Sequence, residues 1–290
     1  FLAGNYSSFV QSYRFAATDG ASFAFRPRAI SFVMVGGLLA AVIGPQVAIH
    51  TRDLFPEAPF VGSFLGQGAL ALIALPILFL LRPVPMPAAV EGGGRPLWQI
   101  VRAPRFVVAV SAGTVTYALM SFVMTAAPVA MVGCGHTVGE ATLGIQWHVL
   151  AMFGPSFVTG RLINRIGHSA TTALGLLLIA AAAGVALSGL AVAHFWIALV
   201  LLGVGWNLGF IGATAMVTEC YRPEERAKVQ AANDFLMFGT VAVASFSSGK
   251  LLDVAGWETV NWIVFPLVTL VLVMIGAQEL ELMKPSAFLI

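Results

Sequence analysis

Apolar runs of about the length needed to cross a lipid bilayer recur along almost the whole chain. A membrane-spanning helix needs about 20 mostly apolar residues to cross the hydrocarbon core. The composition agrees, because 59% of the residues are hydrophobic and only 10% are charged, far from the usual values of a soluble domain. The sequence therefore predicts an all-α membrane protein.

We expect nine membrane spans, with the first one incomplete because the chain begins inside an apolar pattern. The expected spans are residues 1–18, 30–50, 62–81, 106–132, 141–159, 169–190, 195–218, 229–252 and 260–277. Three spans followed by six form an asymmetric pattern. The simplest explanation is that three spans are missing before Phe1, which would give two bundles of six helices.

A single stretch of different composition separates the two groups of spans. Residues 83–104 contain five prolines and the triplet from Gly92 to Gly94, which is typical of an extended, solvated linker. The predicted organisation is an incomplete N-terminal bundle at 1–82, a cytoplasmic linker at 83–104, and a complete six-span C-terminal bundle at 105–290.

A short cationic elbow connects the expected spans 141–159 and 169–190. It includes Gly160, Arg161, Asn164, Arg165 and Gly167, so two fixed positive charges lie between two turn-forming glycines. Positive charge gathers in the cytoplasmic loops of membrane proteins. We therefore place this elbow in the cytoplasm.

The remaining positive charges agree with that orientation. If the elbow is cytoplasmic, only Arg52 and Lys250 among the 15 lysines and arginines fall on the opposite side, with Arg14 at a helix end left out.

A set of three charges with the same spacing occurs twice, 200 residues apart, each time before a span of one proposed half. This internal repeat favours two homologous halves. Its members are Asp19, Arg26 and Arg28 in one half, and Glu219, Arg226 and Lys228 in the other.

The elbow is similar to the G-x-L-x-D-R-x-G-R loop of the major facilitator superfamily of secondary transporters, with Asn164 where that family usually has Asp. The pair Gly44 and Pro45, in the outer half of its span, resembles part of the glycine-proline signature in the fifth span of many members, notably exchangers. Together with the repeat, the resemblance covers essentially the whole chain as spans four to twelve.

The resemblance implies a secondary transporter that works by alternating access, with the lipid bilayer, a small-molecule substrate and a coupling proton or cation as its partners. Proton-coupled export of drugs or metabolites is our first hypothesis, and uptake of a nutrient such as a vitamin or organic acid is the alternative. We expect a monomer in the bacterial inner membrane. An intramembrane enzyme and a channel are the rival classes.

No motif in the sequence supports an enzyme or a cofactor. We find no Ser-His-Asp arrangement, no HExxH and no phosphate-binding glycine loop. Cys134 and Cys220 fall in loops on opposite sides and have no metal-ligand spacing. We therefore predict no catalytic residue, no cofactor, no metal and no nucleic-acid partner.

Ionisable residues inside spans are costly and usually functional. Asp234 lies about two turns into its span and is a candidate proton or cation site, with Asn233 as a hydrogen-bonding neighbour. The alternative is an acid that pairs locally with Arg226 or Lys228. His148 could accept a coupling proton, or it could simply form a hydrogen bond between helices.

Polar and aromatic residues in the middle of spans are the candidates for substrate contact. Trp206 and Asn207 lie among glycines and can line a cavity or pack between helices. Tyr117 is a weaker candidate on another span. Arg161 and Arg165 are interpreted as a cytoplasmic latch with Glu219 and Glu225 as possible partners, the alternative being plain positive-inside charges.

Overall fold

The computed structural model describes Tyr13 and residues 26–58, 60–80 and 94–283. The chain divides into two compact units, Phe1–Ala89 and Val90–Ile290. All of the regular structure in the described part is helical, so the predicted all-α fold is confirmed. The expected span 1–18 falls outside the described residues, apart from Tyr13.

The first unit contains a hairpin of two apolar helices, α2 (Arg26–Thr51) and α3 (Val61–Phe79). They match the expected spans 30–50 and 62–81. The helices lie close together where they meet, because a Cβ on Gly62 would lie only 2.0 Å from the Thr51 carbonyl oxygen. Thr51 Oγ1 also donates to Ser63 Oγ at 3.4 Å. The glycine therefore permits the turn between the two helices.

The second unit is a helical bundle in which α9 is central. Its elements are α4 (Leu97–Val101), α5 (Pro104–Gly133), α6 (Val138–Phe153), α7 (Ser156–Ile166), α8 (His168–Leu187), α9 (Val192–Thr218), the 3-10 helix η1 (Pro223–Glu225), α10 (Arg226–Trp262) and α11 (Val264–Met283). Helix α9 packs against α5, α6 and α8. Its apolar stretch is 72% buried, so α9 forms the core of this unit.

Glycines set the close approach of α8 and α9. A Cβ on Gly175 would lie 2.3 Å from the backbone nitrogen of Gly209, and one on Gly205 would lie 2.8 Å from the Gly175 carbonyl oxygen. Small residues allow helix backbones to approach in a bilayer, where van der Waals packing drives association. The predicted role of the glycines around Trp206 in helix packing agrees with this geometry.

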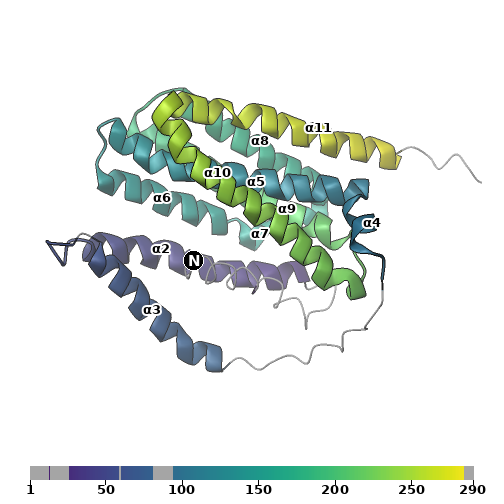
Figure 1. Cartoon of the computed structure of the whole chain (residues 1–290), viewed down its shortest axis with the longest axis horizontal. Coiled ribbons are helices and arrows are strands. Elements are labelled where there is room, and N and C mark those ends of the chain that lie inside the picture. The colour runs from purple at the N-terminus through teal and green to yellow at the C-terminus, as the bar shows by residue number, and fades with distance from the viewer. Residues whose placement is uncertain (1–12, 14–25, 59, 81–93, 284–290) are drawn as a thin grey trace, which may run out of the picture. The chain divides into compact units, whose positions relative to one another are not determined.

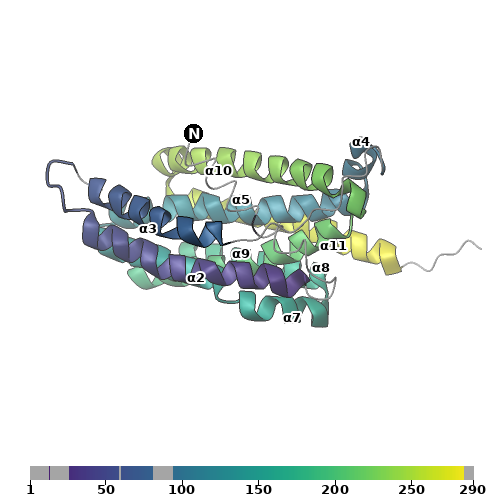
Figure 2. The same ribbon diagram turned by 90° about the horizontal axis from the view of Figure 1, so that it is seen from below.

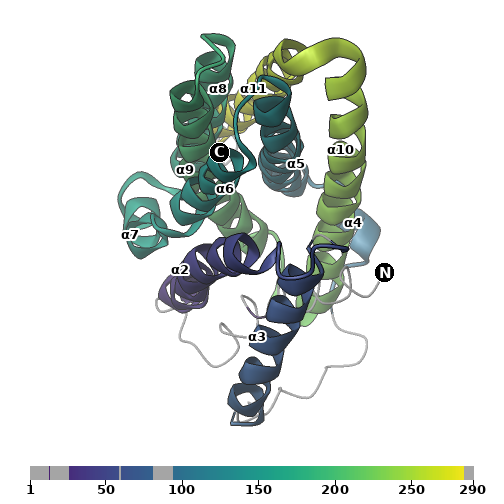
Figure 3. The ribbon, with the colours of Figure 1, turned by 90° about the vertical axis from the view of Figure 1, so that its left-hand side faces the viewer.

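Four helical stretches of the described residues are long and apolar enough to cross a membrane, judged by length and composition. They are Pro104–Gly133, His168–Leu187, Val192–Thr218 and Pro223–Glu281, and Val35–Thr51 and Val61–Ile77 are shorter apolar helices. The last long stretch contains both α10 and α11. Figures 1 and 3 show the chain reversing between these two helices, in agreement with two expected spans there.

Helix α10 is kinked at Gly256, whose φ of 79° and ψ of 173° are not helical. A residue with a side chain is strained in that conformation, whereas glycine adopts it readily. The kink divides α10 into two helical segments, and the first of them, up to Gly256, agrees with the expected span 229–252.

The expected span 141–159 is wrong as a single helix. Helix α6 has 16 residues and ends at Phe153, which gives a length of about 24 Å, and α7 begins after Pro155. In Figures 2 and 3, α7 lies to one side of the other helices of this unit. Proline cannot donate a helical hydrogen bond, which explains the break at this position.

The elbow is also not a loop as predicted. Residues from Gly160 to Ile166 belong to α7, and the chain turns only at Gly167, with φ 85°. The elbow residues are therefore arranged on a short helix. The end of the expected linker differs as well, because Leu97–Val101 forms the helix α4 instead of an extended chain.

Candidate functional site

Five aromatic side chains meet in the interior of the second unit. Tyr117 on α5 makes edge contacts with Trp206 and Phe210 on α9, at ring-centroid distances of 5.5 and 5.4 Å, and with Phe238 on α10 at 5.7 Å. Trp206 and Phe210 are stacked at 4.9 Å with an interplanar angle of 13°, and Phe153 on α6 lies 6.0 Å from Trp206. We call these five residues the aromatic cluster.

The aromatic cluster joins buried and half-buried rings. Trp206 is only 2% exposed, and its indole Nε1 is buried with no hydrogen-bond partner in the described part of the chain. Tyr117, Phe153 and Phe238 are half-buried. Aromatic faces and edges favour stacked or edge contacts with other flat rings. The half-buried rings of the cluster therefore leave part of their aromatic surface open to further contacts.

The structure favours the packing role over the cavity-lining role for Asn207. Its Nδ2 donates to the Met152 carbonyl oxygen at 2.6 Å and to Ser156 Oγ at 2.7 Å, while its Oδ1 accepts from Thr159 Oγ1 at 2.6 Å. Asn207 is fully buried. It therefore holds α9 across the break between α6 and α7, where the backbone lacks its regular hydrogen bonds.

His148 also connects two helices. Its Nδ1 lies 2.7 Å from the Leu199 carbonyl oxygen on α9. A carbonyl oxygen can only accept, so Nδ1 carries the proton and donates. The other nitrogen, Nε2, is buried without a partner among the described residues. A second proton on Nε2 would create a buried cation with no compensating group, which favours the interhelical alternative for His148.

Asp234 and Asn233 lie together near the start of α10. Asn233 Nδ2 donates to Asp234 Oδ1 at 3.0 Å, and both residues are half-buried. The predicted hydrogen bond between them is therefore present. The Nδ1 of His148 donates to the Leu199 carbonyl oxygen on α9, so this nitrogen is not available to Asp234. A role of Asp234 in coupling stays a prediction.

The proposed latch residues occupy different surroundings from those expected. Arg161, Asn164 and Arg165 are exposed on α7, and neither arginine makes an ion pair within the described part of the chain. Glu219 Oε1 lies 3.4 Å from His168 Nδ1. In this conformation Glu219 faces the start of α8, and the latch stays a prediction.

Other predicted gating residues lie at helix ends or inside a helix. Arg226 begins α10, and Gly44 and Pro45 lie within α2. The first copy of the repeated charge pattern falls on residues whose side chains are outside the described part.

Glu225, a possible latch partner from the sequence, instead forms an ion pair with Arg95 at the start of the second unit; its carboxylate is buried, while the Arg95 side chain is 39% exposed. The Arg95 side chain donates from Nε to Glu225 Oε1 at 2.9 Å and from a terminal nitrogen to Oε2 at 2.8 Å. The backbone nitrogens of Arg95 and Arg222 donate to the same carboxylate at 2.7 and 3.0 Å. These hydrogen bonds, led by that from the Arg95 side chain, hold the pKa of Glu225 well below its usual range.

Comparison with known proteins identifies the family of the chain. The sequence model of the Major Facilitator Superfamily matches residues 6–238 and 156–279. The chain belongs to the major facilitator superfamily. A solved structure described as a bacterial homologue of the iron transporter ferroportin in an outward-facing state has a TM-score of 0.61 and 16% identity, over 91% of this chain and 66% of that one. At that identity it shows the fold alone.

Relatives within the superfamily are transporters. The riboflavin transporter RfnT of Brucella anthropi is 63% identical over 274 residues, which is 93% of this chain and 69% of that protein. Two uncharacterised transporters of Bacillus subtilis, YddS and YdeG, are each 31% identical over 82% of the chain. The chain spans 59% and 60% of their respective lengths.

Membership of the superfamily makes the chain an integral membrane protein of a transporter family, as the sequence predicted. Sequence reasoning found Tyr117 and Trp206, but missed Phe153, Phe210 and Phe238. The chain has 21 phenylalanines, and their spacing does not separate these three from residues that face lipid. One signal was present, because Phe210 follows Trp206 by four residues and so shares its helix face.

Proposed function

We propose that this superfamily member takes up riboflavin, or a closely related flavin, across the bacterial inner membrane. The observation that supports the proposal is the 63% identity with the riboflavin transporter RfnT over 93% of the chain. Vitamin uptake, the alternative from the sequence, is thus better supported than export of drugs or metabolites. The activity belongs to the complete gene product.

The aromatic cluster supports this substrate class. The isoalloxazine ring of a flavin is flat, aromatic and rimmed with carbonyl and nitrogen acceptors. Tyr117, Phe153 and Phe238 offer partly exposed rings for stacking or edge contact with that ring system. In this proposal the half-buried rings contact the flavin, and Trp206 and Phe210 support them from behind.

Accumulation against a gradient requires coupling, which we assign to protons and to Asp234. A carboxylate that moves between water and a low-dielectric surrounding changes its preference for the charged form. Asp234 is half-buried near the start of α10, and Asn233 Nδ2 can stabilise its charged form by donating a hydrogen bond. His148 has only a structural role in this scheme.

Uptake of labelled riboflavin by a bacterium that can neither make nor import it tests the proposal. Cells that express the complete gene product should accumulate the label, and an unlabelled excess of riboflavin should compete. Everted vesicles distinguish direction, since an exporter would load them from outside when energised. No uptake by cells together with energised loading of everted vesicles would replace the proposal by export.

The role of the aromatic cluster is tested by Tyr117→Leu, with Tyr117→Phe as the matched control. Loss of the ring should raise the KM for riboflavin about 2- to 10-fold, because an aromatic pair contributes about 0.5–1.5 kcal/mol beyond its buried area. The control keeps the ring and should stay near the unmodified protein. Equal KM values for all three proteins would remove Tyr117 from the binding site.

A further inference from the structure

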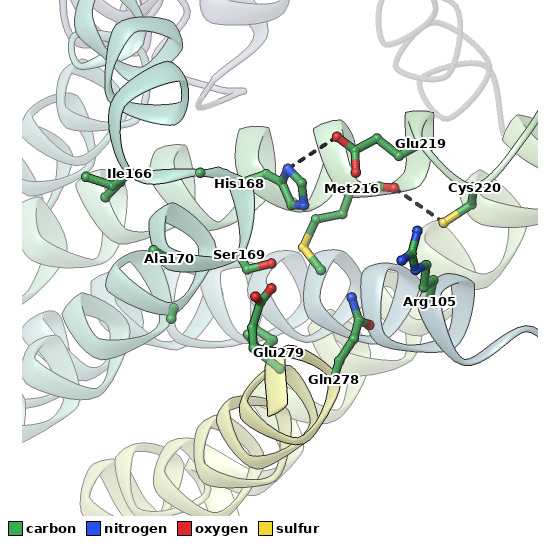
Figure 4. A pocket seen from close by; sticks show the side chains of 13 residues that line it. Arg105, Ile166, His168, Ser169, Ala170, Met216, Glu219, Cys220, Gln278 and Glu279 are labelled. Carbon is green, nitrogen blue, oxygen red and sulfur yellow. Dashed lines mark hydrogen bonds and ion pairs between the residues drawn. The ribbon is translucent and has the colours of Figure 1, made fainter. Parts of the chain in front are cut away.

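A pocket lies at one end of the second unit, away from the aromatic cluster. Its volume is about 480 Å³, and the ends of α5, α8, α9 and α11 form its walls. Figure 4 shows the polar side chains around it, including Arg105, Ser169, Gln278 and Glu279. Met216 and Ile275 add apolar surface. The pocket is a mixed polar and apolar site with no role in the proposed transport.

Several polar groups of this pocket lack a partner. Ser169 is only 8% exposed, and its Oγ has no hydrogen bond within the described part of the chain. The same holds for the buried Oε1 of Gln278. Buried polar atoms are normally satisfied, and each exception calls for an explanation such as an absent ligand. Two such atoms that line one pocket therefore point to an occupant.

The charges around the pocket define the occupant further. The Arg105 guanidinium and the Glu279 carboxylate make no hydrogen bond or ion pair with described residues, whereas Glu219 lies beside His168. In Figure 4 the Ser169 hydroxyl and the Glu279 carboxylate face one another, and Arg105 lies beyond Gln278. One side therefore offers acceptors for an ammonium group, and the other offers a cation for an anionic group.

The position of the pocket along the helices suggests where the occupant comes from. The pocket lies at the first turns of α5 and α8 and the last turns of α9 and α11. These are ends of apolar helices that are expected to span the bilayer, on the side that the positive charges predict to be cytoplasmic. A pocket at this level meets lipid headgroups, and its apolar wall meets the upper part of the acyl chains.

We propose that this pocket binds the phosphoethanolamine headgroup of a phospholipid from the cytoplasmic leaflet. The ammonium lies between Glu279, Ser169 and Gln278, and the phosphate lies against Arg105. A phosphocholine headgroup has no N–H donor for these acceptors. A phosphatidylglycerol headgroup brings only negative charge toward Glu279 and Glu219. Soluble glycerophosphoethanolamine carries the same phosphoethanolamine group without acyl chains. The test therefore compares the lipid with this molecule.

The test measures lipid binding to the complete gene product, so it is independent of transport. The delipidated protein is titrated with dioleoyl-phosphatidylethanolamine, -phosphatidylcholine or -phosphatidylglycerol, and bound lipid is counted by native mass spectrometry. We expect one phosphatidylethanolamine to bind about tenfold more tightly than the other two, as for a charge-assisted hydrogen-bonded contact. Equal affinities for the three lipids would overturn the proposal.

Two variants and one competitor make the test specific to this pocket. Glu279→Gln should remove the preference for phosphatidylethanolamine over phosphatidylcholine, and Arg105→Gln should weaken both because both carry the phosphate. Glu258→Gln, an exposed acid beyond the kink of α10 and outside the lining of this pocket, is the matched control and should keep the preference. If the Glu279→Gln variant still preferred phosphatidylethanolamine over phosphatidylcholine, the assignment of Glu279 to the ammonium group would be wrong.

The competitor identifies the source of the headgroup. A hundredfold excess of glycerophosphoethanolamine should leave the bound lipid in place, because it lacks the chains that contact Met216 and Ile275. Displacement at equal concentration would assign the pocket to a soluble zwitterion and overturn the lipid assignment.

Discussion

Polar side chains in the middle of the second unit and at its end are buried in different ways. In the middle, Asn207 and His148 use neutral groups that bond to backbone carbonyl oxygens of a neighbouring helix. At the end, Glu225 is a buried charge held by Arg95 and by two backbone nitrogens. Neutral polar groups lose less hydration free energy than charges do when they leave water. The ion pair is therefore found at the end of the unit, where water is near.

Asp234 belongs to neither group, because it is a half-buried acid that accepts a hydrogen bond from the Asn233 side chain. The largest expected effect of a substitution concerns this residue. If Asp234 is the coupling acid, Asp234→Asn should abolish accumulation of riboflavin driven by a proton gradient, while exchange of substrate across the membrane continues. His148→Gln should keep gradient-driven accumulation, because we assign His148 to helix packing. Flux into proteoliposomes at varied proton gradient measures both variants.

Either of two results would change this assignment. Full gradient-driven accumulation by Asp234→Asn would make Asp234 a structural residue. Loss of accumulation in His148→Gln, with exchange intact, would place a functional proton in the middle of the unit and remove the distinction between the two regions.

Asn207 tests the middle region by stability. Asn207→Leu removes hydrogen bonds to Met152, Ser156 and Thr159 and leaves buried polar atoms unpaired. We expect a loss of about 2 kcal/mol in stability, seen as a lower Tm of the purified protein. Thr142→Val is the matched control, because Thr142 is half-buried and its hydroxyl bonds only within its own helix. Equal Tm values for Asn207→Leu and the control would show that the helix break needs no such support.

The helices of the described part were largely predictable, because long apolar runs determine them. The break after α6 was not, since Pro155 interrupts the backbone without interrupting the apolar pattern of residues 141–159. The kink of α10 at Gly256 falls between the expected spans 229–252 and 260–277, so the apolar pattern and the backbone agree there. At Pro155, by contrast, hydropathy and backbone hydrogen bonding carry different information.

The candidate site was predictable only in part. Trp206 and Tyr117 stood out as aromatic residues with a polar group in the middle of spans, but the phenylalanines of the aromatic cluster did not. The sequence identified Asn207 and His148 as unusual and left their roles open, because their hydrogen-bond partners, both backbone carbonyls and hydroxyl side chains, lie on other helices. The pairing of Arg95 with Glu225 joins residues 130 positions apart, and several other charges were equally plausible partners.

The ion pair at the end of the unit is tested by Glu225→Gln. Loss of the charge weakens the contacts with the Arg95 side chain and backbone, so amide hydrogen exchange in Gly94, Arg95 and helix α4 should become about tenfold faster. Glu224→Gln is the control, since Glu224 is the exposed neighbour. Unchanged exchange in Glu225→Gln would mean that α4 holds this segment without the ion pair.

The smallest expected effect is the response of this ion pair to mild acid. The folded-state pKa of Glu225 is lowered by its hydrogen bonds with Arg95 and Arg222. A lowered pKa stabilises the fold at pH values above the ordinary carboxylic pKa, and this contribution disappears only as the pH falls through the folded value. Protection of the Arg95 amide, corrected for intrinsic exchange, should therefore be the same at pH 7 and pH 5. A loss of protection between these values would show that the carboxylate is protonated in its ordinary range, and Glu225 would then differ little from an exposed acid.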